Sequence, residues 1–155
     1  MSSHLKSRLK DLGIVLPTPA APVASYVPFV FSGSSLYVSG QLPIKDGNMI
    51  KGCLGKDLSI EQGQEAAKLC AINILAQANA ALAGKLDRIV RCVKLGGFVA
   101  STPDFFDHPK VMNGASDLIV AALSNAGKHA RFAVGVSALP FGVAVEVDAV
   151  FEIIP

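Results

Sequence analysis

The chain has 155 residues, of which 51% are hydrophobic and 17% charged, and its formal net charge is +2 at pH 7. The near-neutral charge gives nucleic-acid binding no support. The sequence has no uninterrupted apolar run of about 18 residues, so we do not predict a membrane span. Because the charged share is below the usual value of about 25%, we expect other copies of the chain to cover part of its surface.

Residues 1–25 form the N-terminal part of the single domain that we expect over residues 1–155. Residues 1–13 alternate charged side chains with Leu5, Leu9 and Leu12, which predicts a short amphipathic helix rather than a secretion signal. The proline-rich stretch 16–28 predicts an extended lead-in to the rest of the domain.

The next segments predict strands followed by a helix. Residues 27–33 and 35–43 are β-prone and meet at Gly33 and Ser34, which predicts a hairpin. Residues 45–52 then predict a turn and a short third strand. The clearest helix begins after Ser59, because Ser59 and Gln62 have the spacing of a capping box, and Gly84 marks its end.

The second half of the chain predicts the remaining elements. Residues 88–99 predict a strand with a bulge at Gly96 and Gly97, and residues 111–126 predict a helix. Two strands, 130–138 and 143–153, follow around the turn-like sequence LPFG. The order βββ-α-β-α-ββ predicts an α+β fold, a mixed sheet with two helices on one face. Sheets from several subunits would then meet on the other face.

Arg131 and Glu146 are charged residues inside the last two, otherwise apolar, strands. If these strands form a hairpin, Arg131 pairs with Val150 and Gly135 with Glu146, which places both charges on the face turned away from the helices. They would lie about 14 Å apart in one chain, too far for a salt bridge. Either the arginine of one subunit faces the glutamate of its neighbour across a cleft for a small carboxylate, or the two form an interface ion pair.

Three segments of the sequence resemble a known family, namely YVPFVFSGSSLYVSGQLP, LGGFVASTPDFFDHPKVMNGASD and HARFAVGVSALPFGVAVEVDAVFEI. They resemble the YjgF/RidA family of reactive-intermediate deaminases, also called endoribonuclease L-PSP proteins, in a divergent bacterial subgroup. The resemblance spans about residues 14–154 and implies a chorismate mutase-like homotrimer with sheets facing the centre and a site in each inter-subunit cleft. Family members hydrolyse imines and enamines such as 2-aminoacrylate to 2-keto acids and ammonia, with no cofactor and no metal.

The resemblance also assigns roles to individual residues. Arg131 matches the arginine that holds the substrate carboxylate, and Glu146 matches the acid that orients or activates water. The positions that match residues lining the family's ligand pocket are Tyr26, Ser39, Gly40 and Asn113. Ala133 stands where many relatives have a cysteine, so that cysteine plays no part here.

Other functions stay open beside deamination. A non-catalytic trimer that binds a small carboxylate metabolite would use Arg131 but would not need Glu146 for turnover. Endoribonuclease activity follows from the family's second name, and chorismate mutase activity follows from the fold alone.

The histidines and cysteines complete the candidate groups. His129 is predicted to lie on the same face as Arg131, and we interpret it as a surface or interface residue, whereas His4 and His108 belong to no motif. The cysteines are odd in number and far apart, which predicts buried side chains in a reducing cytoplasm rather than disulfides or a metal site. They are Cys53, Cys70 and Cys92.

Overall fold

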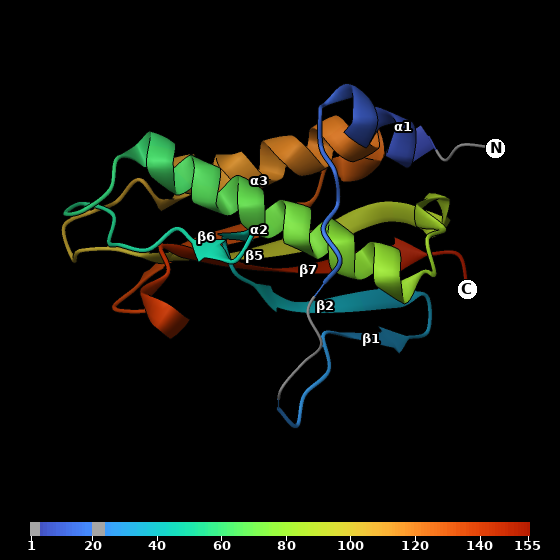
Figure 1. Ribbon diagram of the computed structural model, residues 1–155, viewed down its shortest axis with the longest axis horizontal. Coiled ribbons are helices and arrows are strands. Elements are labelled where there is room, and N and C mark those ends of the chain that lie inside the picture. Colours follow the sequence, from blue (N-terminus) through green and yellow to red (C-terminus); the bar gives the residue numbers. More distant parts are fainter. Residues whose placement is uncertain (1–3, 20–23) are drawn as a thin grey trace.

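The computed structural model of the protein describes residues 4–19 and 24–155 and has two layers, helices above and a sheet below (Figure 1). In chain order the elements are α1 (His4–Asp11), β1 (Phe29–Ser32), β2 (Ser35–Gln41), β3 (Ile44–Lys45), β4 (Asn48–Met49), α2 (Ile60–Ala81), η1 (Leu86–Arg88), β5 (Ile89–Ala100), α3 (His108–Leu123), η2 (Ser124–Gly127), β6 (Ala130–Val136), η3 (Pro140–Gly142) and β7 (Val145–Ile153). The predicted α+β fold is confirmed. Part of the predicted proline-rich lead-in, residues 20–23, lies outside the described residues.

The main sheet has five strands in the order β1-β2-β7-β5-β6. Only the β5–β6 pair is parallel, so the sheet is mixed as predicted. The hairpin predicted at Gly33 and Ser34 joins β1 to β2, with Ser32 opposite Ser35. The short strands β3 and β4 form a second, two-stranded hairpin of their own.

The hairpin predicted between the last two strands is wrong. β6 pairs with one side of β5 and β7 pairs with the other, so β5 separates them. α3 connects β5 to β6, and a connection through a helix returns the chain parallel to the strand it left. Arg131 consequently pairs with Leu95 rather than with Val150, and Glu146 pairs with Phe98.

The two long helices begin where the chain supplies start signals. The Ser59 hydroxyl accepts a hydrogen bond from the Gln62 backbone N–H (3.1 Å), and the Gln62 side chain accepts one from the Ser59 backbone N–H (2.8 Å), which completes the predicted capping box of α2. α3 begins at His108, one turn before the predicted start, because Pro109 occupies its first turn. A side chain at Gly114 would collide with the Gln64 carbonyl oxygen, so this glycine lets the two helices approach closely.

The bulge predicted at Gly96 and Gly97 is also wrong. The register of β5 runs without a shift from Lys94 onward, and the shifts lie before that residue. The two glycines instead make room for neighbours on the two faces of the sheet. A side chain at Gly97 would collide with Met112 of α3, and one at Gly96 would collide with Asp148.

The core lies between the helices and one face of the sheet. Its largest fully buried side chains are Phe151, Leu36, Leu54, Ile74, Leu75, Leu82, Leu86, Leu95, Met112 and Ile119. The predicted amphipathic helix α1 buries Leu5 and Leu9 and packs on α3 (Figure 1), where Arg8 donates a hydrogen bond to the Ala122 carbonyl (3.3 Å). Among the residues described, no helix combines the length and apolar character needed to cross a membrane.

The opposite face of the sheet is open and keeps large apolar side chains in contact with solvent. Val30, Tyr37 and Val134 are each between 42% and 50% exposed. All three lie on this open face, because each alternates along its strand with residues on the helix-covered side. Of the cysteines, Cys70 and Cys92 are buried as predicted, and Cys53 is half-buried.

Candidate functional site

Arg131 lies on the helix-covered side of β6, which is an edge strand of the sheet. It shares this side with the buried Leu95, its neighbour in the ladder. The guanidinium reaches α3, where Nη1 donates to Asn113 Oδ1 (3.0 Å) and to Ser116 Oγ (3.1 Å), and Nη2 donates to the Pro109 carbonyl (3.5 Å). The prediction that Arg131 lies on the face away from the helices is therefore wrong.

A second set of hydrogen bonds holds Ser116 in turn. His129 Nδ1 lies 2.6 Å from the Gly127 carbonyl oxygen, which can only accept, so this nitrogen carries the hydrogen. In the neutral ring, Nε2 then accepts from the Ser116 hydroxyl at 2.9 Å. The bonds run in one direction from Arg131 through Ser116 and His129 to Gly127, and they fix the guanidinium from behind. His129 thus lies on the side of Arg131, as predicted.

The fixed guanidinium keeps one edge available. Within the described residues, Arg131 Nε makes no hydrogen bond, and Nη2 makes only the long one to Pro109. Two parallel N–H groups on one edge of a guanidinium match the two oxygens of a carboxylate. The arrangement can therefore bind a carboxylate without moving the arginine.

Glu146 lies on the open face of the sheet, because the residues on either side of it, Val145 and Val147, are buried under the helices. Its carboxylate rests against the backbone of Gly40, where any side chain would collide with it. Half-burial of this carboxyl raises its pKa above the ordinary value, and the neighbouring Asp148 carboxylate raises the pKa further. Glu146 and Arg131 are consequently on opposite faces of the same sheet.

Ser39 and Tyr26 lie on the Glu146 side of the molecule. Ser39 precedes Gly40 at the irregular end of β2, where the register against β7 shifts. Its hydroxyl donates to the Val27 carbonyl (2.8 Å) and its N–H donates to the Pro28 carbonyl (2.9 Å), which ties down the segment before β1. Tyr26, on that segment, is 60% exposed.

The six residues that the resemblance singled out thus fall into two groups. Arg131 and Asn113 are in direct contact at the β6 edge of the sheet. Gly40 and Glu146 are in contact near the other edge. Ser39 precedes Gly40, and Tyr26 precedes Val27, whose carbonyl accepts the Ser39 hydrogen bond. One chain therefore contains both halves of the predicted site, but the two halves lie apart, on opposite faces of the sheet.

A serine–histidine pair that the sequence analysis did not single out lies close to α3. Ser101 Oγ and His108 Nε2 are 3.0 Å apart. The two residues are separated by residues 102–107, a loop that contains Pro103. No spacing motif marks the pair, so only the folded loop reveals the contact. Ser116 was missed for the same reason, since its role comes from its contact with Arg131.

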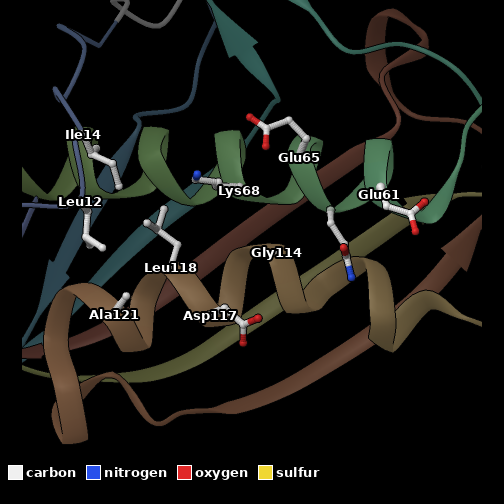
Figure 2. Close-up of a pocket in the computed structure, with 10 residues that line it drawn as sticks. Leu12, Ile14, Glu61, Glu65, Lys68, Gly114, Asp117, Leu118 and Ala121 are labelled. Atoms are coloured by element: carbon white, nitrogen blue, oxygen red, sulfur yellow. The ribbon is translucent and has the colours of Figure 1, made fainter.

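A groove between α2 and α3, with a volume of about 380 Å³, lies on a different side of α3 (Figure 2). Its carboxylates come from Glu61, Glu65 and Asp117, and its cation is Lys68. None of the residues assigned by the resemblance lines it. Within the described part of the chain, no cluster of His, Cys, Asp and Glu side chains has a geometry that could hold a metal ion.

A five-stranded mixed sheet under two helices, with an arginine clamp at one edge, defines a small α+β protein of the chorismate mutase-like class. A model of the family described as "YjgF/chorismate_mutase-like, putative endoribonuclease" matches residues 6–152. The chain therefore belongs to this family, as its motifs predicted.

Individual relatives agree with this assignment. The crystal structure of the protein Atu1372 from Agrobacterium tumefaciens is 51% identical and superposes with a TM-score of 0.92, over 97% of this chain and 93% of that one. The protein TCP17 from Trypanosoma cruzi is 51% identical over 154 residues, which are 98% of this chain and 96% of the relative. RidA from the Antarctic bacterium Psychrobacter sp. is 28% identical, with a TM-score of 0.60 over 88% of this chain and 94% of that one.

Proposed function

We propose that this protein is a homotrimeric deaminase that hydrolyses reactive 2-imino and enamine acids of the 2-aminoacrylate type to 2-keto acids and ammonia. The observation that carries the proposal is the Arg131 guanidinium, which its own chain fixes while one N–H edge stays available for a carboxylate. The similarity to a protein called RidA supports the same reaction class.

The placement of the two half-sites supports assembly as a ring. Arg131 lies on the edge strand β6, and Gly40 with Glu146 lies toward the opposite edge. If the β6 edge of one subunit meets the β2 side of the next, the contact is head-to-tail and closes into a ring. The exposed apolar side chains on the open face would then be covered by the sheets of the other subunits.

The chemistry follows from the charges of the substrate. A 2-imino acid carries a carboxylate, which Arg131 holds, and a protonated imine, which is already electrophilic. Glu146 of the neighbouring subunit would stabilise the iminium cation and orient the attacking water. Because Glu146 is partly desolvated, an adjacent cation stabilises its ionised form more than it would stabilise a fully hydrated carboxylate.

The proposal is tested by measuring 2-keto acid formation from enzymatically generated 2-aminoacrylate. Wild type should accelerate the reaction over buffer, and Arg131→Ala and Glu146→Gln should each lower kcat/KM by roughly 100-fold, as the loss of one electrostatic group usually does. Arg91→Ala is the matched control, because Arg91 is exposed and bonds only to the Lys128 carbonyl (3.4 Å). Light scattering should report a trimer; a monomer at working concentration would contradict the shared site.

A non-catalytic binding trimer is the second candidate, because the arginine clamp is complete in a chain whose Glu146 is on the other face. It predicts no acceleration by wild type but saturable binding of pyruvate that Arg131→Ala abolishes. Endoribonuclease activity, which the family description names, is tested by incubation with RNA. Cleavage that persists in Arg131→Ala would point to a contaminant.

A further inference from the structure

His108 and Ser101 form a hydrogen-bonded pair at the start of α3. His108 is the first residue of the helix, and Ser101 follows the last residue of β5. Besides the 3.0 Å contact between His108 Nε2 and Ser101 Oγ, the Phe105 ring packs edge-on against the imidazole, with 5.3 Å between ring centroids. Contacts from two directions hold the imidazole in one orientation although both residues are only half-buried.

The pair lies over Gly135 of β6. A side chain at Gly135 would collide with both His108 Nε2 and Ser101 Oγ. The pair can form there because residue 135 is a glycine. Gly135 itself is exposed. The space around the two polar atoms is therefore bounded by backbone and open to solvent.

Arg131 faces the same side of β6 as this pair. Residues 131, 133 and 135 alternate onto one side of the strand, and only the methyl group of Ala133 stands between Arg131 and Gly135. Arg131 Nη2 also approaches the carbonyl of Pro109, the residue after His108. Arg131 and the Ser101–His108 pair therefore border the same strip of the β6 surface, with Ala133 between them.

The two histidines on this side differ in what their ring nitrogens do. Both nitrogens of His129 are bonded within the chain, to Ser116 and to Gly127. His108 uses Nε2 with Ser101, and its Nδ1 has no hydrogen-bond partner within the described residues. His108 is thus the histidine that can exchange a proton with a ligand or water without breaking the support of Arg131.

We propose that His108, acting through the Ser101 hydroxyl, is the acid–base group for the substrate that Arg131 holds. This inference rests on the proposed function and adds a proton acceptor from the same subunit as Arg131. With His108 accepting the proton, Glu146 on the open face has only to orient water and stabilise charge.

The substrate enters the reaction as a protonated imine. Water adds to the imine carbon, its proton passes to Ser101 Oγ, and the Ser101 proton passes to His108 Nε2. The imidazolium returns a proton through Ser101 to the amino nitrogen. The C–N bond then breaks with its electron pair on nitrogen, and the hydroxyl proton leaves with ammonia as ammonium. The 2-keto acid remains, and His108 is neutral again.

The decisive variant is His108→Gln, which keeps a hydrogen-bonding side chain but cannot exchange protons near neutral pH. We expect kcat to fall about 100-fold or more, which is the usual contribution of a general acid–base group. KM should stay within about 3-fold of wild type, because the Arg131 clamp is intact. His4→Gln is the matched control, since His4 is exposed at the start of α1. An unchanged kcat in folded His108→Gln would overturn the inference.

Two further variants separate proton transfer from packing. Ser101→Ala removes the relay and keeps the imidazole, whereas Gly135→Ala keeps both groups and forces them apart. Each should lower kcat by about 10-fold or more, with circular dichroism confirming the fold.

A binding experiment distinguishes failure of this inference from failure of the proposed function. Pyruvate is titrated into the full chain while the His108 ring proton is followed by NMR, its resonance being assigned by its loss in His108→Gln. If wild type does not hydrolyse imines but pyruvate shifts this resonance in an Arg131-dependent way, the site stands and only the deaminase proposal fails. If pyruvate binds and the resonance does not move, or if pyruvate does not bind, the role of His108 is overturned.

Discussion

Arg131 and Glu146 lie on opposite sides of the sheet and differ in how their own chain holds them. Arg131, at the β6 edge, is held by three hydrogen bonds to α3, whereas Glu146, on the open face, has no hydrogen bond or ion pair within the described residues and rests against Gly40. One group is fixed by its own chain, and the other is partly desolvated beside a like charge. This difference agrees with the proposed site between subunits, in which each chain would supply one arginine already held in place and one carboxylate that needs a partner.

Mixing two inactive variants gives the largest expected effect. Arg131→Ala and Glu146→Gln are co-refolded in equal amounts, so that trimers contain both kinds of subunit. If each site takes its arginine and its glutamate from different subunits, about a quarter of the sites in random trimers are intact, and activity returns to about that fraction of wild type. The measurement is the rate of imine hydrolysis before and after mixing. If both residues acted within one subunit, every chain would carry a defect and the mixture would stay inactive.

Gly40→Ala tests the Glu146 side alone. The new methyl group would occupy the place of the Glu146 carboxylate, which is the end of a flexible side chain and can swing away. The free energy of unfolding should therefore change by only about 1 kcal/mol, while kcat falls roughly 10-fold because the carboxylate is displaced. Chemical denaturation and steady-state kinetics measure the two effects. Gly47→Ala is a useful comparison for stability, since its added methyl group meets open space but the residue has a φ of 77°.

The smallest effect is a pH-dependent difference in stability. The pKa of Glu146 is raised in the folded protein, so the folded state binds its proton more tightly than the unfolded state. Ionisation of Glu146 therefore destabilises the folded protein as pH rises above its unfolded value of about 4.3. Glu146→Gln should melt slightly above wild type at pH 7, and the difference should disappear near pH 4. A lower melting temperature for the variant at pH 7 would mean that a neighbouring subunit's cation already pairs with Glu146.

Much of the local structure could be read from short-range patterns. Ser59 and Gln62 predicted the start of α2 because a capping box involves only neighbouring residues. Alternation along each strand correctly placed Arg131 with Ala133 and Gly135, and Glu146 with Asp148. The family motifs identified the fold, which the comparisons confirm.

Alternation could not say which side of β6 faces the helices. That side depends on the strand beside it, and the assumed neighbour, β7, was wrong. Because pairing with β5 places Arg131 beside the buried Leu95, the arginine contacts α3 instead of the open face. Gly96 and Gly97 were misread for a related reason, since their role is to admit side chains from other elements.

The amino-acid sequence by itself determined the type and order of the elements, the residues that share a side within each strand, and the family, because these depend on neighbours along the chain. Only the tertiary structure decided that β5 separates β6 from β7 and that α3 accepts hydrogen bonds from Arg131. It also decided that His108 contacts Ser101 over Gly135. The physical reason is that strand pairing and side-chain contacts between distant segments follow from how the core is packed, which no local pattern records.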